Sequence, residues 1–470
     1  MKYCSLAILR EHSIINRINS FLTTPCYIAL VMLLTALANL LELEIAMYSW
    51  IALVAVYVCL LGKDLLPLMP LFISGYVIPS RNNTPGRNPE SVFYGASGDY
   101  ICFLAAVIGA ALIVHVIRER KKITKTKPQL LLGMMALSAA YMLSGIGSNH
   151  YINVWERNVL HALLQSAAIL IPYLLFCIFV DWDKVCGNYF AWIGVCVGVL
   201  LCIEIVGIYC TQEVIVDGVV LRDQIYTGWG MYNNMGGLLA MMIPCAFCLA
   251  TIYRKVWIGV VAGSAFLGGV LLTCSRSSIL TAGLAYCVCG FLMFRYVGNR
   301  RKNTIVLIIG SVAILLTIIL FREQFMGLFH VLMNLGLKLN NRDIIYREGI
   351  AKFLQSPILG NSFYCTGFKP DAWSTLESFH NIIPPRWHNT VLQMLVCCGV
   401  VGIFAYLFHR LQTVKLFLCR ASSENVFIAC SIMVLLIGSM FDCHFFNIGP
   451  VLYYSMALSF VENIRYSKKL

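Results

Sequence analysis

The chain has 470 residues, of which 59% are hydrophobic and only 12% are charged, and its mean hydropathy is +0.78. Ordinary soluble proteins carry about 25% charged residues, so this composition excludes a cytosolic enzyme, a disordered chain and a secreted disulfide scaffold. The apolar stretches are continuous for about 20 residues, which excludes the alternating strands of a membrane barrel. The sequence therefore predicts an all-α, polytopic integral membrane protein.

Apolar runs follow one another along nearly the whole chain. Pro67 and Pro70 interrupt the third run, which we expect to be kinked or re-entrant, so the prediction is about 12–14 transmembrane helices. The first run lacks a small-residue cleavage site and is expected to be a retained span. The predicted spans are 22–41, 45–61, 65–79, 99–117, 129–147, 160–180, 189–209, 233–253, 256–273, 279–294, 303–321, 389–409, 425–441 and 445–461.

These spans divide the chain into three parts. Residues 1–321 hold transmembrane helices 1–11, residues 322–388 form one long loop, and residues 389–470 hold the C-terminal transmembrane helices. If the N-terminus is cytoplasmic, 23 of the 35 Lys and Arg residues fall in inside segments and none falls within a span. Because positive residues in short loops favour the cytoplasmic side, we expect both termini there and the long loop outside. The net charge of +13 thus concerns membrane orientation, and no nucleic-acid partner is expected.

The long outside loop of residues 322–388 is too apolar to be disordered. Residues 323–339 place apolar side chains at helical spacing and predict an amphipathic helix on the outer membrane face. Residues 342–355 predict a second helix, capped by Asn340 or Asn341 and ended by Ser356-Pro357. Loops of this length in a compact protein are usually functional.

Positive residues at the outer membrane edge are the first candidates for chemistry. Arg276 lies in a short turn, Thr273 to Ser278, between two apolar runs. It is either an anchor to lipid headgroups or a guanidinium that holds a phosphate or pyrophosphate, for which its planar fork is well suited. Arg342 shares a helix face with Tyr346, and because Asp343 and Arg347 can pair with each other, Arg342 is the freer phosphate ligand.

His388 and Asn389 open the span that follows the long loop. A histidine at a membrane boundary is either an ordinary interface residue or, because its pKa is near neutral, a general base for a sugar hydroxyl. Aromatic and basic residues nearby are secondary substrate-binding candidates, unless they form an interfacial aromatic belt. These are Arg222, Tyr226 and Trp229 before the span at 233–253, and His380, Arg386 and Trp387 before His388.

Three segments together resemble the O-antigen ligase and O-antigen polymerase superfamily of bacterial envelope biogenesis. The resemblance covers roughly residues 228–410, and Asn234 at the start of a span is a weaker fourth match. The three segments are Leu272–Leu280 with its Ser275-Arg276 pair, Arg342–Gly360 with its Ser356-Pro357 step, and His388–Gly402 with its His388-Asn389 pair.

The resemblance implies a metal-independent glycosyltransferase at the outer face of the bacterial inner membrane. The donor would be a glycan on undecaprenyl pyrophosphate, and the acceptor a second lipid-linked glycan or a lipid A core. Arg276 and Arg342 would match the family's arginines that hold the pyrophosphate, and His388 its histidine that activates the acceptor hydroxyl. Asn389, Tyr346, Asn234, Arg222, Arg386, Trp387 and His380 would line the substrate site. No cofactor is expected.

Two other classes remain open at this stage. A lipid-linked glycan transporter or flippase would need charged or broken-helix sites near the middle of its spans, which the sequence does not predict. A non-catalytic scaffold of an envelope-assembly complex would not depend on Arg276 or His388. Four properties stay open at this stage: the sugar, the acceptor, the choice between ligase and polymerase, and the oligomeric state.

Overall fold

A computed structural model describes residues 12–41, 43–77, 96–148, 151–211, 214–216, 219–227, 230–297, 342–363, 386–420 and 422–464, with isolated residues 304, 305, 308, 312 and 319. The described part is a bundle of helices with two two-stranded hairpins, so the prediction of an all-α membrane protein is confirmed. Its helices are α2 Ser13–Leu22, α3 Pro25–Leu41, α4 Glu44–Leu61, α5 Leu68–Val77, α7 Ala96–Arg118, α8 Arg120–Lys125, α9 Leu131–Met142, α10 Tyr151–Phe179, α11 Tyr189–Thr211, α12 Tyr232–Ile252, α13 Val256–Leu272, α14 Arg276–Tyr296, α17 Arg342–Gln355, α19 Thr390–Cys419, α20 Ser423–Gly438 and α21 Ile448–Asn463.

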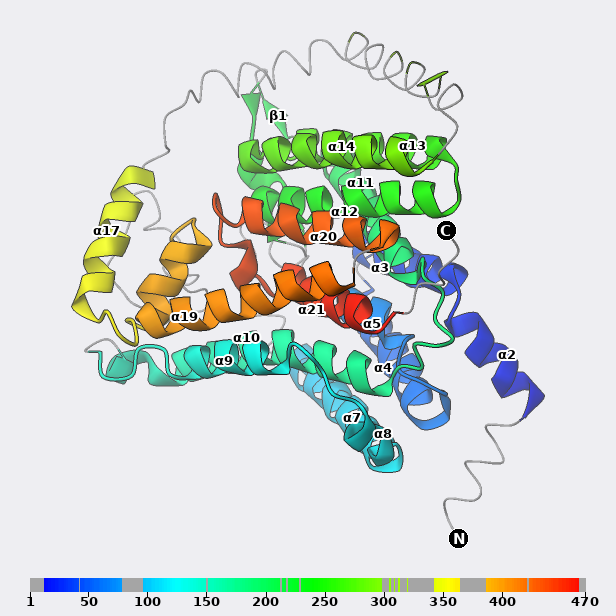
Figure 1. Cartoon of the computed structure of the whole chain (residues 1–470), viewed down its shortest axis with the longest axis horizontal. Coiled ribbons are helices and arrows are strands. Elements are labelled where there is room, and N and C mark those ends of the chain that lie inside the picture. The colour runs from blue at the N-terminus through cyan, green and yellow to red at the C-terminus, as the bar shows by residue number, and fades with distance from the viewer. Residues whose placement is uncertain are drawn as a thin grey trace.

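The long helices lie side by side, and α17 crosses one end of the bundle (Figure 1). Helix α12 is the most deeply buried of the seven long apolar helices and packs against α11, α13, α14 and α20. Because α12 is apolar all round, it is stable only in the interior of the bundle. The two hairpins, β1 Ile215–Val216 with β2 Val219–Val220 and β3 Tyr226–Thr227 with β4 Gly230–Met231, connect α11 to α12, and the short 3-10 helix η2 Arg222–Gln224 lies between them.

Seven helices of the described part are long and apolar enough to cross a membrane. An eighth arises if Ser13–Leu22 and Pro25–Asn39, which meet at 72°, form one broken span. Shorter apolar helices, including α9, α13 and α20, correspond to further predicted spans, whereas most of the run at 303–321 lies outside the described residues. A polytopic membrane protein is confirmed, and the count of about 12–14 spans stays a prediction.

Two boundaries differ from the sequence prediction. The helix expected to end at residue 409 continues as α19 to Cys419 and therefore includes Arg410 and Lys415. The expected span 389–409 is also not one straight helix, because Gly399 breaks it with φ 63° and ψ −159°. By contrast, the helix expected at 342–355 is confirmed as α17, while the amphipathic helix expected at 323–339 lies outside the described residues.

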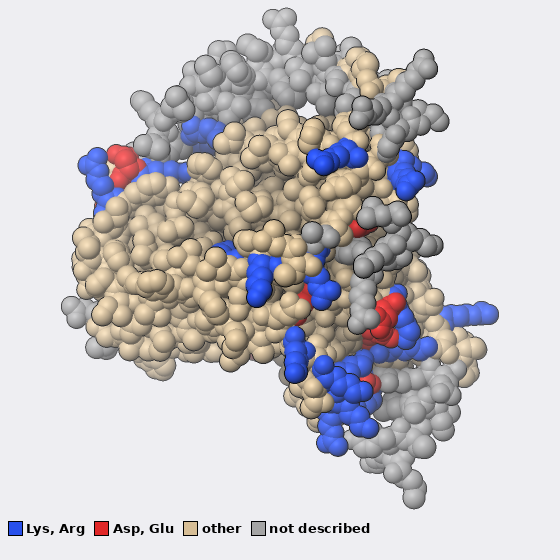
Figure 2. Space-filling model, viewed as in Figure 1, with Lys and Arg blue, Asp and Glu red and all other residues tan. Residues whose placement is uncertain are grey.

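Charged side chains are sparse along the bundle. Figure 2 shows a largely uncharged surface with separate groups of blue Lys and Arg, among them one near α17 and one around α7 and α8. Within the second group, Arg118 donates to the carbonyl oxygens of Leu60 at 2.8 Å and Cys59 at 3.0 Å. A cation at a helix C-terminus binds carbonyls that lack helical partners, so Arg118 ties α7 to the end of α4.

Candidate functional site

The turn between α13 and α14 is fixed to the start of α12. Ser275, which precedes α14, donates from its hydroxyl to Asn233 Oδ1 at 2.8 Å, and its oxygen also lies 2.8 Å from Ser278 Oγ. Cys274 takes a positive φ of 54°, which tightens the turn. These contacts hold the backbone of Arg276 at the first position of α14.

Arg276 lies within a group of three guanidiniums from three separate segments. Arg222 in η2 and Arg342 at the start of α17 both lie near enough to repel the positive charge of Arg276. Arg222 also lies over the ring of Tyr232, with its Cζ 5.2 Å from the ring centroid. Like charges at close range oppose folding, so an anion bound among these residues would offset the repulsion.

Tyr346 connects Arg342 to His388. Arg342 lies close to the Tyr346 hydroxyl, which in turn donates to the backbone oxygen of His388 at 3.3 Å. Burial raises the pKa of Tyr346, and the positive charge of Arg342 partly opposes that rise. The phenol therefore remains protonated near neutral pH and can keep donating to the His388 carbonyl.

The imidazole of His388 faces a buried carboxylate that the sequence analysis missed. Nδ1 of His388 lies 3.5 Å from Oδ1 of Asp442, an ion-pair distance that lacks hydrogen-bond geometry in this conformation. The side chain of His388 is 33% exposed and that of Asp442 only 10%. Burial acts to raise the pKa of Asp442, but the interaction with His388 and the positive charge that His444 carries when it is protonated hold this pKa well below its usual value. The sequence signal was an Asp and a His in the short interval between two apolar runs.

Two adjacent glycines of α12 join the arginine side of the site to the histidine side. A Cβ at Gly236 would lie 2.7 Å from Thr273 Oγ1, and a Cβ at Gly237 would lie 2.7 Å from the His444 ring. Only glycine allows both approaches on consecutive residues. His444 is 2% exposed, and burial lowers its pKa, so the ring beside Asp442 is neutral near pH 7.

The break in α19 brings together the segments Arg342–Gly360 and His388–Gly402. Gly399 interrupts the helical hydrogen bonds, and the chain after α17 replaces them: Val400 N donates to Pro357 O at 2.9 Å, and Asn361 N donates to Val396 O at 2.8 Å. Gly360 approaches so closely that a Cβ there would lie 2.2 Å from Cys397 O. This backbone joint fixes α17, and with it Arg342, relative to the segment that carries His388.

Two predicted substrate-binding residues have contacts that support the site from within. Asn389 caps α19, since its Oδ1 accepts from the amides of Val391 at 2.9 Å and Leu392 at 3.1 Å. Trp387 is 3% exposed and packs against α17 beside Gly349. Both side chains hold His388 in place, and contact of either with a substrate stays a prediction.

The other secondary candidates are divided between two sides of the site. Asn234 accepts from Asn447 Nδ2 at 2.7 Å and so joins α12 to α21. Arg386 donates to Phe446 O at 3.1 Å, and Phe446 belongs to the same turn as Asp442. His380 and Trp229 lie outside the described residues, as does the side chain of Tyr226.

The site thus contains guanidiniums and an imidazole–carboxylate pair. Within the described part of the chain, no group of three or more His, Cys, Asp or Glu side chains is placed to hold a metal ion. Residues 262–407 match the family model described as O-antigen ligase. No curated protein matches the chain. The matched segment includes Arg276, Arg342 and His388, so this part of the chain is similar to the O-antigen ligase family.

Proposed function

We propose that the protein is a membrane glycosyltransferase that moves a glycan from undecaprenyl pyrophosphate to a hydroxyl of a second glycan. The observation that carries the proposal is that Arg276 interacts with both Arg222 and Arg342, and that Tyr346 connects Arg342 to His388, although these residues come from separate segments. The family match supports glycan assembly as the general activity. The lipid-linked donor and the roles of individual residues are the proposal itself.

The arginine group suits the departing pyrophosphate. Cleavage of the bond between the sugar and the phosphate places growing negative charge on the leaving group. Guanidiniums whose positions are fixed before the reaction stabilise that charge without reorganisation. Arg276, held by the Ser275 turn, and Arg342, held through Tyr346, would contact the two phosphates, with Arg222 beside them.

His388 suits the acceptor. As the acceptor oxygen attacks the anomeric carbon, its proton must leave, and a neutral imidazole nitrogen can take it. Nδ1 faces Asp442, so Nε2 is the nitrogen left for the acceptor hydroxyl. The carboxylate would orient the ring and stabilise the imidazolium that forms. His388 thus takes the proton, the acceptor oxygen forms the new glycosidic bond, and the lipid pyrophosphate leaves as the old bond breaks.

The acceptor distinguishes a ligase from a polymerase. A lipid A core would make the protein a ligase, and a second lipid-linked glycan would make it a polymerase. We favour the ligase because the His388-Asn389 and Ser275-Arg276 pairs are the more ligase-like form. We place the reaction on the outer face of the bacterial inner membrane, with both termini cytoplasmic, following the distribution of positive residues.

Turnover of a defined donor tests the proposal. Purified protein in lipid nanodiscs should consume a synthetic undecaprenyl-pyrophosphate glycan and form a new glycosidic bond when an acceptor is present. Arg276→Ala, Arg342→Ala and His388→Ala should each abolish this activity. Arg347→Ala, an exposed arginine on the same helix as Arg342, is the matched control and should retain it. Full turnover in the site variants would show that the site assignment is wrong.

A transporter of lipid-linked glycans is the second candidate, because Arg410 places a charge within the long helix α19. Charges inside membrane helices often mark transport paths. Labelled donor that crosses a proteoliposome bilayer without forming a glycosidic bond would favour this class. A scaffold role would be favoured if the Arg276 and His388 variants kept the pathway intact in cells.

A further inference from the structure

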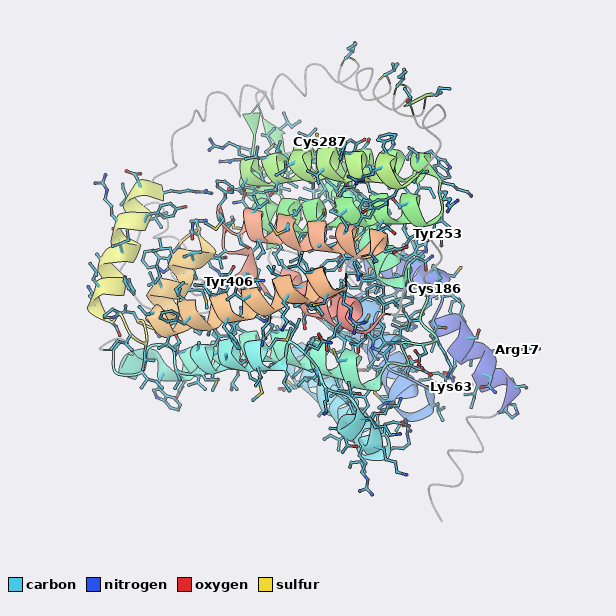
Figure 3. All side chains as sticks on the ribbon, in the orientation of Figure 1. Arg17, Lys63, Cys186, Tyr253, Cys287 and Tyr406 are labelled. Atoms are coloured by element: carbon cyan, nitrogen blue, oxygen red, sulfur yellow. The ribbon has the colours of Figure 1, made fainter. Side chains whose placement is uncertain are left out.

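Arg410 is a charged residue of α19 that the site described above does not use. Its Cζ lies 4.3 Å from the ring centroid of Phe445, 4.5 Å from that of Tyr406 and 5.0 Å from that of Tyr454. Tyr406, labelled in Figure 3 beside α19, meets Phe445 edge to face, with their ring centroids 5.7 Å apart. Cation–π contacts form within about 6 Å, so three rings enclose the guanidinium.

Polar contacts fix the same cluster. Arg410 Nη1 donates to the Tyr454 hydroxyl at 2.7 Å, and the same hydroxyl lies 2.8 Å from His409 Nε2 and 3.2 Å from Thr413 Oγ1. Nε and Nη2 of Arg410 are buried and have no hydrogen-bond partner in the described part of the chain. The faces of the aromatic rings therefore provide much of what stabilises this charge.

Phe445 belongs to the short 3-10 helix η4 His444–Phe446, which follows Asp442 directly. Every part of this turn contacts a different element: Asp442 meets His388, His444 meets Gly237 of α12, and the Phe446 carbonyl accepts from Gln165 of α10 at 2.6 Å. Phe445 is fully buried, and Arg410 is the cation on its face. The aromatic cluster is thus one contact between this turn and α19, and the thiol of Cys443, which lies 3.3 Å from Gln393 Oε1, is another.

We propose that Arg410 is a positioning residue that acts through Asp442. The guanidinium, held on α19 and α21, clamps Phe445 and so sets where the 442–446 turn places its carboxylate relative to the imidazole of His388. His388 lies two residues before Thr390, the first residue of α19, and Arg410 lies beyond the break at Gly399, so the two segments of one broken helix contact the two members of the pair. The contacts that support this inference do not depend on the proposed function, but the turnover assay that tests it does.

Substitutions at Arg410 separate this role from simple stability. Arg410→Met removes the charge but fills the space, and we expect kcat for donor consumption to fall about 10- to 100-fold. Binding of the donor lipid, measured in nanodiscs without acceptor, should change by less than about twofold, because the arginine group is untouched. Arg410→Lys keeps a cation over the rings and should recover part of the loss. Lys415→Met, an exposed residue of the same helix, should match wild type.

A double-variant cycle tests whether Arg410 works through Asp442. If it does, Arg410→Met should cost little further activity once Asp442→Asn is present, because coupled residues are not additive. Phe445→Leu removes the ring from the other side of the contact and should give the same kcat loss if Arg410→Met folds poorly. Additive losses, or wild-type kcat in both Arg410→Met and Phe445→Leu, would overturn the inference. Wild-type turnover in His388→Ala and Arg276→Ala would instead overturn the proposed function.

Discussion

Nδ1 of His388 lies 3.5 Å from Oδ1 of Asp442, although His388 precedes α19 in the chain and Asp442 follows α20. The backbone of His388 has a positive φ of 49°, which is uncommon for a residue with a side chain and costs conformational energy. The Asn389 cap and the contact with Tyr346 hold that conformation. Such strain at a polar site is typical of residues whose placement serves chemistry.

Asp442→Asn should lower turnover more than it lowers donor binding. The amide keeps the shape of the side chain but loses the negative charge that orients His388 and stabilises its protonated form. We expect kcat to fall roughly 10²-fold, within the range of general-base catalysis. Steady-state kinetics with the undecaprenyl-pyrophosphate glycan give the measurement, and Asp343→Asn, at an exposed position of α17, is the control. An equal loss in donor affinity would place Asp442 in the binding site instead.

The acid side of the stability profile should depend on Asp442. The pKa of this carboxyl is depressed in the folded state, so its contribution is complete above the unfolded value of about 3.9 and is lost as the pH falls toward the folded value. At pH 6, Asp442→Asn should lower the thermal midpoint in detergent by roughly 2–4 °C relative to wild type. The difference should shrink below about pH 4. A difference that stays constant down to pH 3 would contradict this linkage.

Arg276→Gln should have opposite effects on the empty and the occupied protein. Removal of the Arg276 guanidinium, which is repelled by both Arg222 and Arg342, should raise the thermal midpoint of the protein without ligand by about 1–3 °C. The same change should weaken binding of inorganic pyrophosphate about 10- to 100-fold, because a hydrogen bond to a charged group is lost. Arg347→Gln should do neither. Destabilisation of the empty protein by Arg276→Gln would argue against the repulsive cluster.

Glycine at 360 and 399 should be required for the joint between the chain after α17 and α19. Both residues have positive φ, 74° and 63°, and a Cβ at Gly399 would lie 2.3 Å from Ile358 O. Gly360→Ala and Gly399→Ala should each cost about 1–3 kcal/mol and lower turnover, because Arg342 and His388 shift relative to each other. A Cβ at Gly283 in α14 would meet no atom within 4 Å, so Gly283→Ala should be neutral or mildly stabilising. Thermal midpoints and donor turnover give the comparison.

Composition and apolar periodicity determined the class of this protein, because lipid permits few backbone structures and long apolar runs are the direct signature of membrane helices. The same local logic placed α17 between Arg342 and Ser356-Pro357, since a proline step ends a helix. Short segments around Arg276, Arg342 and His388 were enough to indicate the family that residues 262–407 match.

Tertiary structure alone decided which residues meet. Asp442 and His444 lie in a short interval between apolar runs, where nothing local signals a partner, and only the packing of α12, α19 and α20 brings them to His388. The break at Gly399 and the placement of Arg410 within α19 were missed because hydropathy records composition along the chain, whereas a helix break is stabilised by hydrogen bonds from a distant segment. Sequence chose the elements and the reactive side chains, and long-range packing chose their neighbours.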